Sequence, residues 1–176
     1  KMKYAITANS GTSTLHIALN AFGIKPGDEV IIPSLTVGMC GFVVWQCGAI
    51  PVYADVKKDT FLMDPEDVER KISEKTKAIM PVHMYGNMCE MGKIMEIAVK
   101  NNLHVVEDCA ECQLSHDDKN RLAGTVGDIG SWSFENSKHL SCGDGGIVTL
   151  DDEDLGDYLR KLNTQGFKTA TAKSGK

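Results

Sequence analysis

Lys138 lies in a short segment whose residue types could carry out covalent chemistry. It follows an apolar run, residues 129–134, and the stretch Gly143-Asp144-Gly145-Gly146 comes soon after it. An amine that is held close to a carbonyl carbon can form an imine, and glycines let the chain turn tightly beside such a group. Taken alone, the simpler explanation of Lys138 is a solvated surface lysine.

Ser10-Gly11-Thr12 stands where a loop is expected to enter a helix. Free backbone N–H groups and the helix dipole make a helix start a binding site for anions. Gly11 would let the backbone approach a ligand closely, and the two hydroxyls could donate to phosphate oxygens. Capping of the helix by a serine or threonine explains the same residues without any ligand.

Asp108 directly follows an expected strand, residues 103–107. In parallel α/β sheets, ligands bind at the carboxyl ends of the strands. A carboxylate there can pair with a protonated heterocyclic nitrogen. Pyridoxal phosphate (PLP) needs such a partner at its ring nitrogen, because the charged ring is the electron sink. An aspartate that caps a loop at a strand end is an equal alternative.

Short apolar runs alternate along the chain with helical patterns, which is typical of parallel β/α units. The expected strands are 29–33, 50–54, 76–82, 103–107, 129–134 and 146–150. The expected helices are 12–22, one that starts at 64–67, 89–101 and 151–162. We therefore predict an α/β fold of three layers, α/β/α, around a mainly parallel sheet, with Ser10, Asp108 and Lys138 converging at one edge.

The composition is that of an ordinary globular protein, and it excludes some classes of function. Of the 176 residues, 42% are hydrophobic and 24% charged, and the formal net charge is -5. No basic run suits a phosphate backbone, so we expect no nucleic-acid binding. No stretch of about 18 apolar residues is present, so we expect no membrane span.

The cysteines point to a reducing compartment. The six cysteines are scattered through expected core elements, and the N-terminus lacks the layout of a signal peptide. We therefore predict free thiols in a cytoplasmic protein. Cys109 and Cys112 form a lone C-x-x-C, and because structural zinc needs four ligands we predict no metal site there.

Taken in order, these motifs resemble those of the DegT/DnrJ/EryC1/StrS family of PLP-dependent sugar aminotransferases. The resemblance runs in unbroken order over nearly the whole chain. It is carried by Ser10-Gly11-Thr12, Pro33-Ser34-Leu35-Thr36, the stretches 48–55 and 75–86, Glu107-Asp108-Cys109-Ala110, Ser133-Phe134 through Lys138, and Gly143-Asp144-Gly145-Gly146.

The resemblance implies a fold and a role for each matching residue. The fold would be the large domain of the type I (aspartate aminotransferase) PLP-dependent transferases. Lys138 would form the Schiff base with PLP, and Asp108 would pair with the pyridine nitrogen. The remaining cofactor-binding residues would be Ser10 together with the phosphate-binding Gly11, Thr12 and Ser133.

Two positions depart from the family pattern. Val37 stands where members often carry a large residue that stacks on the cofactor ring, so only apolar contact is expected there. Glu111 stands where members commonly have Gln or His, and an acid next to the cofactor could alter its electronics or the tolerated substrate charge. His139 is one residue late for the histidine that replaces the lysine in related sugar dehydratases, so we interpret it as a surface or substrate-side residue.

The implied reaction moves an amino group from glutamate or glutamine to a keto sugar that is usually nucleotide-linked. We expect residues 1–166 to form the PLP-binding large domain and 167–176 a loop or cut end, without the family's small C-terminal domain. Members are homodimers with shared active sites, so a homodimer is expected.

Three alternatives stay open. A PLP-dependent sugar dehydratase is disfavoured because Lys138 is in register with Ser133 and the glycine run. A nucleotide-binding Rossmann module is disfavoured because no G-x-G-x-x-G follows the first strand. The third is a truncated fragment or binding module without catalytic activity.

Overall fold

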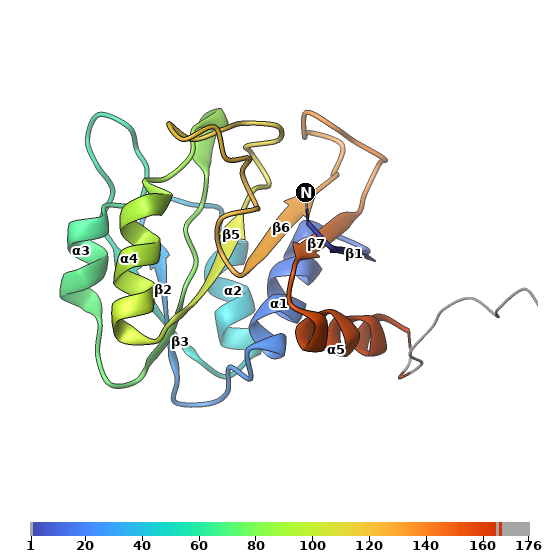
Figure 1. The fold of residues 1–176 in the computed structure, drawn as a ribbon, viewed down its shortest axis with the longest axis horizontal. Coiled ribbons are helices and arrows are strands. Elements are labelled where there is room, and N and C mark those ends of the chain that lie inside the picture. The colour runs from blue at the N-terminus through green and yellow to red at the C-terminus, as the bar shows by residue number, and fades with distance from the viewer. Residues whose placement is uncertain (1, 165, 167–176) are drawn as a thin grey trace, which may run out of the picture.

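The computed structural model describes residues 2–164 and 166, so the prediction made for 167–176 lies outside the described residues. Within the described part, seven strands form one sheet (Figure 1). They are β1 (Tyr4–Ala8), β2 (Glu29–Pro33), β3 (Ile50–Ala54), β4 (Thr76–Ile79), β5 (His104–Asp108), β6 (Ile129–Ser133) and β7 (Gly146–Leu150).

The strand order is β1-β7-β6-β5-β4-β2-β3. From β3 to β6 neighbouring strands are parallel, whereas β7 runs antiparallel to both β6 and β1. The predicted α/β fold with a mainly parallel sheet is therefore confirmed. Because Ser133 and Ala8 both pair with Gly146, the ends of β1 and β6 and the start of β7 meet at one edge.

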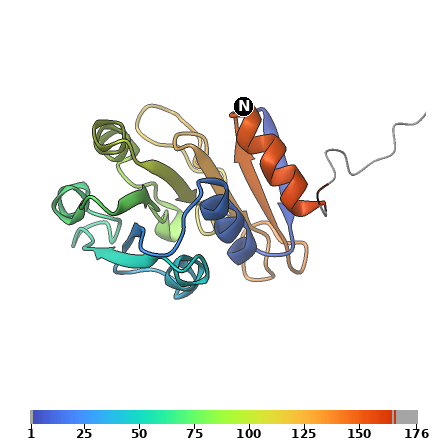
Figure 2. The same cartoon turned by 90° about the horizontal axis from the view of Figure 1, so that it is seen from below.

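The helices cover both faces of the sheet. They are α1 (Gly11–Ala21), α2 (Met39–Gln46), α3 (Pro65–Lys71), α4 (Met91–Asn101) and α5 (Glu153–Asn163), with a 3-10 turn at Met84–Gly86. The helices α3 and α4 pack together on one face, and α1 and α2 on the other, where α5 lies against α1 and β1 (Figure 2).

Local sequence explains where these helices begin. At α3 the Asp64 side chain accepts the N–H of Glu66, and Pro65 occupies the first helical position, where no donor is needed. At α5 the Asp152 side chain accepts the N–H of Leu155. The central strands are buried on both faces, as Val30, Ile31 and Ile32 of β2 illustrate with 0% exposure.

Several predicted boundaries were wrong. The strand expected to reach residue 82 ends at Ile79, because Pro81 has no N–H with which to continue the ladder. Helix α4 begins at Met91 rather than at residue 89, and β5 and β6 are each displaced or shortened by one residue.

Two elements were not predicted at all. In β1 the buried side chain is that of Ile6, so this edge strand carries little apolar signal. In α2 apolar residues surround the helix instead of forming a stripe, and Gly41, Val43 and Val44 are weak helix formers. Both elements depend on tertiary packing for their formation.

All six cysteines are free thiols. Four of them, Cys40, Cys89, Cys109 and Cys112, are buried. Across residues 2–164 and 166, no helix combines the length and the apolar character that a membrane crossing requires.

Gly130 shows how tightly β6 packs. A Cβ at this position would lie 2.7 Å from Gly124 Cα and 2.7 Å from Thr149 Oγ1. Gly130→Ala should therefore lower the free energy of unfolding by about 2 kcal/mol through overpacking, measured by chemical denaturation. Gly92→Ala in α4 is the matched control, because there an added Cβ meets only Lys119 Nζ at 3.9 Å. Equal effects of the two substitutions would contradict this account.

Candidate active site

A cavity of about 340 Å³ opens at the edge of the sheet where β5 and β6 end. This volume is within the range of small-molecule and cofactor sites. Its wall includes all eight residues predicted from the sequence to bind a cofactor: Ser10, Gly11, Thr12, Val37, Asp108, Glu111, Ser133 and Lys138. The structure therefore confirms that Ser10, Asp108 and Lys138 lie around one cavity, as expected.

The start of α1 forms one wall of the cavity. Ser10 is the N-cap, and its Oγ accepts the N–H of Ser13 at 3.1 Å. The capping interpretation of Ser10 is therefore correct. The first N–H groups of a helix have no acceptor inside it, and those of Gly11 and Thr12 are available at the cavity wall together with the positive end of the helix dipole.

Gly11 is required by the packing of α1 against β6. A Cβ on Gly11 would lie 2.6 Å from Ser133 Cβ, so any larger residue would push the helix start away from the strand end. One turn later, Thr14 Oγ1 and Ser131 Oγ are 2.7 Å apart in a buried hydrogen bond. These contacts place the start of α1 and the hydroxyl of Ser133 side by side, as a phosphate cradle needs.

Asp108 is the last residue of β5 and is 5% exposed. Its Oδ1 accepts the N–H of Ala110 at 3.0 Å, and its Oδ2 accepts the thiol of Cys40 at 3.3 Å. Burial raises the pKa of Asp108, while these two hydrogen bonds oppose the shift. A cationic group in the cavity would compensate for the cost of burying this charge.

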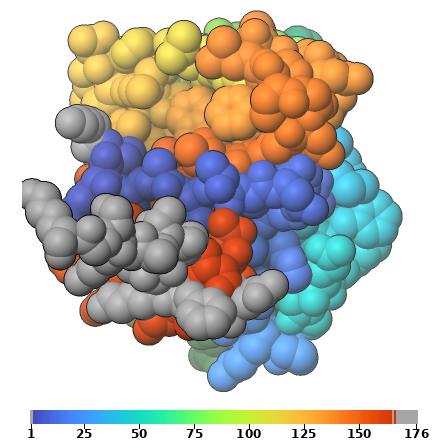
Figure 3. All heavy atoms as spheres, turned by 90° about the vertical axis from the view of Figure 1, so that its right-hand side faces the viewer, coloured from blue at the N-terminus to red at the C-terminus, as the bar shows by residue number. Residues whose placement is uncertain are grey.

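Lys138 lies in the loop between β6 and β7, which Figure 3 shows in orange at the surface. Its Nζ is 3.7 Å from Glu111 Oε1, and its side chain is 17% exposed. Gln113 holds the loop in place: its Nε2 donates to Ser133 O at 2.7 Å, and its Oε1 accepts the N–H of Leu140 at 2.6 Å. Sequence reasoning missed Gln113, because it does not titrate and lies outside the quoted motifs.

The structure also shows where Val37, Glu111 and His139 lie. Val37 is half exposed at the cavity wall, where it offers only apolar contact. Glu111 lies beside Lys138 and lines the cavity. His139 is exposed and does not line the cavity, which agrees with a surface position.

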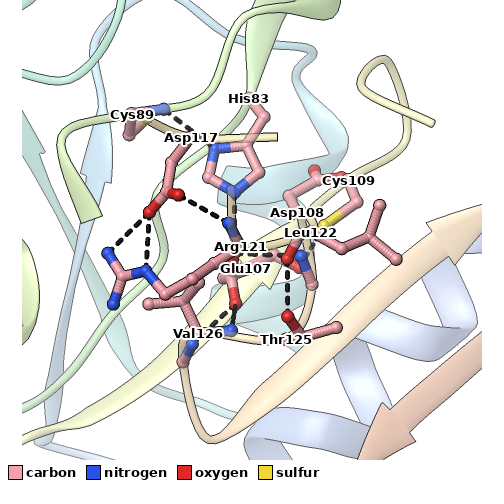
Figure 4. A network of polar contacts seen from close by, with 12 residues as sticks. His83, Cys89, Glu107, Asp108, Cys109, Asp117, Arg121, Leu122, Thr125 and Val126 are labelled. Atoms are coloured by element: carbon pink, nitrogen blue, oxygen red, sulfur yellow. Dashed lines mark hydrogen bonds and ion pairs between the residues drawn. The ribbon is translucent and has the colours of Figure 1, made fainter. Parts of the chain in front are cut away.

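Glu107 anchors the strand that carries Asp108, and sequence reasoning gave it no role. Figure 4 shows its carboxylate, which is fully buried, at the centre of a polar network. It accepts the N–H groups of Gly124, Val126 and Gly127 at 3.0, 2.7 and 2.6 Å, and lies 2.9 Å from His83 Nε2.

The histidine tautomer follows from its second partner. The N–H of Cys89 donates to His83 Nδ1 at 3.2 Å, so Nε2 carries the hydrogen that Glu107 accepts. Burial opposes ionisation, but the hydrogen bonds from His83, Gly127 and Val126 lower the pKa of Glu107. The network joins the segment after β4, strand β5 and the loop that leads into β6.

His83, Glu107 and Cys109 are the one group in the described chain whose atoms lie close enough to hold a metal ion. Both oxygens of Glu107 are already hydrogen-bonded, and Cys109 Sγ donates to Glu107 O at 3.7 Å. We therefore assign this group a structural role and no metal.

The fold and the cavity define an α/β protein in which a helix start, a buried carboxylate and a lysine lie around one cavity. The chain belongs to the DegT/DnrJ/EryC1/StrS aminotransferase family, whose model matches residues 1–175. It is 45% identical to the GDP-perosamine synthase of Caulobacter vibrioides over 166 residues, which are 94% of this chain and 44% of that protein.

Solved structures show the same relationship. DesV of S. venezuelae, in complex with a ketimine intermediate, superposes with a TM-score of 0.89 at 37% identity, over 100% of this chain and 47% of that one. NtdA of Bacillus subtilis, with bound cofactor PMP, gives a TM-score of 0.87 at 34% identity, over 99% of this chain and 39% of that one. The chain thus spans less than half of the length of these relatives.

The Glu107 network should stabilise the fold in a pH-dependent way. Glu107→Gln removes the charge and turns an N–H₂ group toward N–H donors, which should cost about 3 kcal/mol of unfolding free energy at neutral pH. Because the pKa of Glu107 is lowered in the folded state, its contribution is complete above the unfolded value of about 4.3 and is lost as the pH falls through the folded pKa.

Chemical denaturation at several pH values measures this difference. The gap in stability between wild type and Glu107→Gln should be largest near neutral pH and should shrink below about pH 4. Glu96→Gln, on the exposed face of α4, is the control and should behave as wild type throughout. A gap that does not change with pH would show that lost packing, not lost charge, causes the effect.

Proposed function

We propose that this chain is the cofactor-binding part of a PLP-dependent sugar aminotransferase, with residues 1–166 as its large domain. The observation that carries the proposal is that Lys138, Asp108 and the start of α1 meet around one cavity. Each of the three has a weak alternative explanation on its own. A single ligand with a phosphate, a basic ring nitrogen and an aldehyde accounts for all three together.

The residues present fit PLP. The phosphate would be held by the N–H groups of Gly11 and Thr12 and the hydroxyls of Thr12 and Ser133, which the close contact of Gly11 with Ser133 brings together. Asp108 would accept the N–H of the ring nitrogen, since it is the buried carboxylate on the cavity wall. Val37 would contribute apolar contact to the ring, and Ser10 would fix the helix start.

When bound, PLP supplies an electron sink for negative charge at the donor's Cα. The chain's own residues do the rest. Lys138 Nζ would hold the cofactor aldehyde as a Schiff base and, once displaced by the donor amine, would move a proton as general base and acid. Asp108 would keep the ring nitrogen protonated. Glu111, 3.7 Å from Lys138, would place a negative charge beside the reacting carbon.

The names of the relatives support a proposal for the substrates. Names such as GDP-perosamine synthase and dTDP-3-amino-3,4,6-trideoxy-alpha-D-glucose transaminase describe enzymes of amino sugars on nucleotides. We propose a nucleotide-linked keto sugar as the acceptor and glutamate or glutamine as the donor. The free thiols support a reducing, cytoplasmic setting.

We also propose that the protein is a homodimer with shared active sites. Helix α2 leaves Met39, Phe42 and Trp45 40%, 50% and 59% exposed on one side, and Met39 lines the cavity. An exposed apolar face of this kind is typical of an interface. A second copy on this face would close the cavity from solvent.

A PLP-dependent sugar dehydratase is the alternative reaction on this scaffold. It would need a histidine in place of the lysine. The cavity is lined by Lys138, whereas His139 is exposed away from it, and this favours the aminotransferase.

Lys138 should be the residue that reacts with PLP. Incubation of the protein with PLP should produce the yellow colour of an imine, and borohydride reduction followed by peptide mapping should find the cofactor on Lys138. Lys138→Ala and Lys138→Arg should lose the covalent link and retain PLP only through its phosphate. Arginine keeps the positive charge but forms no imine at neutral pH, so it separates bonding from electrostatics. Cofactor on Lys77 or Lys93, or transamination without any labelled lysine, would refute the proposal.

Asp108→Asn should give the complementary result. The imine should form, but transamination should fall by about 100-fold or more, because a neutral amide cannot hold the ring nitrogen protonated. Absorbance and single-turnover rates measure the two effects separately. Glu135→Gln is a control for removal of a carboxylate from the same cavity. Equal losses in both variants would argue against a specific role for Asp108.

A further inference from the structure

Cys40 is a buried thiol in the cavity wall to which the proposed function gives no part. It lies near the start of α2, is 1% exposed, and its Sγ is 3.3 Å from Asp108 Oδ2. A carboxylate accepts but cannot donate when ionised. The single hydrogen of the thiol therefore points to Asp108.

The direction of the next hydrogen bond follows. Thr36 Oγ1 and Cys40 Sγ are 3.1 Å apart. Since the thiol hydrogen is used by Asp108, the Thr36 hydroxyl must donate to the sulfur. The backbone N–H of Cys40 donates to Val37 O at 3.1 Å, which fixes the thiol relative to the loop before α2. Two hydrogen bonds therefore run in sequence: Thr36 donates to Cys40, and Cys40 donates to Asp108.

The thiol is a permanent donor in this position. Burial, and then the charge of Asp108, raise the pKa of Cys40 far above its ordinary value, so it stays protonated. Asp108 has one other donor within the described structure, the N–H of Ala110 on Oδ1. The other titratable side chains that interact electrostatically with Asp108 include His83, Lys138 and Cys109, and none of these three donates a hydrogen bond to its carboxylate.

We propose that Cys40 is a positioning residue that keeps Asp108 ionised and turned toward the cofactor's ring nitrogen. The inference rests on the proposed function, in which Asp108 holds that nitrogen. With Ala110 on one oxygen and Cys40 on the other, the carboxylate cannot rotate, and one lone pair of Oδ2 remains for the ring N–H. Without the thiol, the carboxylate becomes more basic and takes up a proton more readily.

The first test uses the protein without cofactor. Infrared titration, with Asp108→Asn as the reference, measures the midpoint at which the Asp108 carboxyl protonates. Cys40→Ala should raise this midpoint by about half a pH unit or more, roughly threefold in the equilibrium, since a thiol is a weak donor. Cys40→Ser keeps a donor and should not raise it. Cys47→Ala removes a thiol at the other end of α2, and should match wild type.

The second test uses the protein with PLP. Nuclear magnetic resonance of PLP labelled at its ring nitrogen should show less protonation of that nitrogen in Cys40→Ala than in wild type or Cys40→Ser, again by about threefold. Failure of every variant to bind PLP would refute the proposed function, while the titration without cofactor would still decide the role of Cys40. Binding of PLP with identical midpoints in Cys40→Ala and wild type would overturn the inference alone.

A third measurement does not depend on the folding of Cys40→Ala. The infrared S–H band that disappears in Cys40→Ser should lie at lower frequency in wild type than in Asp108→Asn, because a charged acceptor binds the thiol hydrogen more strongly. The same frequency in both proteins would mean that the thiol does not donate to Asp108, and would overturn the inference.

Discussion

The close approach of α1 to the end of β6 and the start of β7 is the contact on which the cavity depends. Gly11 leaves no room for a Cβ beside Ser133, and Gly146 leaves none beside the carbonyl of Ser10. A helix start is a useful anion site only if its N–H groups reach the ligand. By bringing them to the strand end that precedes Lys138, these glycines place the helix start and the amine at one cavity.

The sheet topology extends this constraint to the rest of the site. The edge where β5 and β6 end is also the edge where β1 ends and β7 begins, since β7 runs antiparallel to both of its neighbours. The loop with Lys138 therefore leaves and re-enters the sheet at adjacent strands, and Gln113 ties it to the segment after β5. If β7 were parallel to β6, the connection between them would have to cross to the opposite edge of the sheet.

The sequence predicted most of this arrangement, and the omissions have physical causes. Strand β2, which is buried on both faces, was predicted with correct bounds because its apolar run is continuous. The bounds of the edge strand β3 were also correct, although Ile50 and Tyr53 are exposed. The cavity residues were found because lysine, aspartate and a helix start each suggest chemistry by their type, and because the order of their motifs along the chain resembles that of a known family. Gln113 and Cys40 were not found, because a partner in space, and not a neighbour in sequence, gives each its role.

Adjacent carboxylates on β5 show how the fold assigns different tasks to one chemical group. Glu107 and Asp108 point to opposite sides of the strand, and both are buried. Glu107 is surrounded by donors, so its pKa falls in spite of burial, and it has no bonding capacity left for a ligand. Among the described residues, Asp108 has two donors, and burial raises its pKa. The carboxylate that the protein leaves incompletely satisfied is the one at the cavity, where a cationic ligand can complete it.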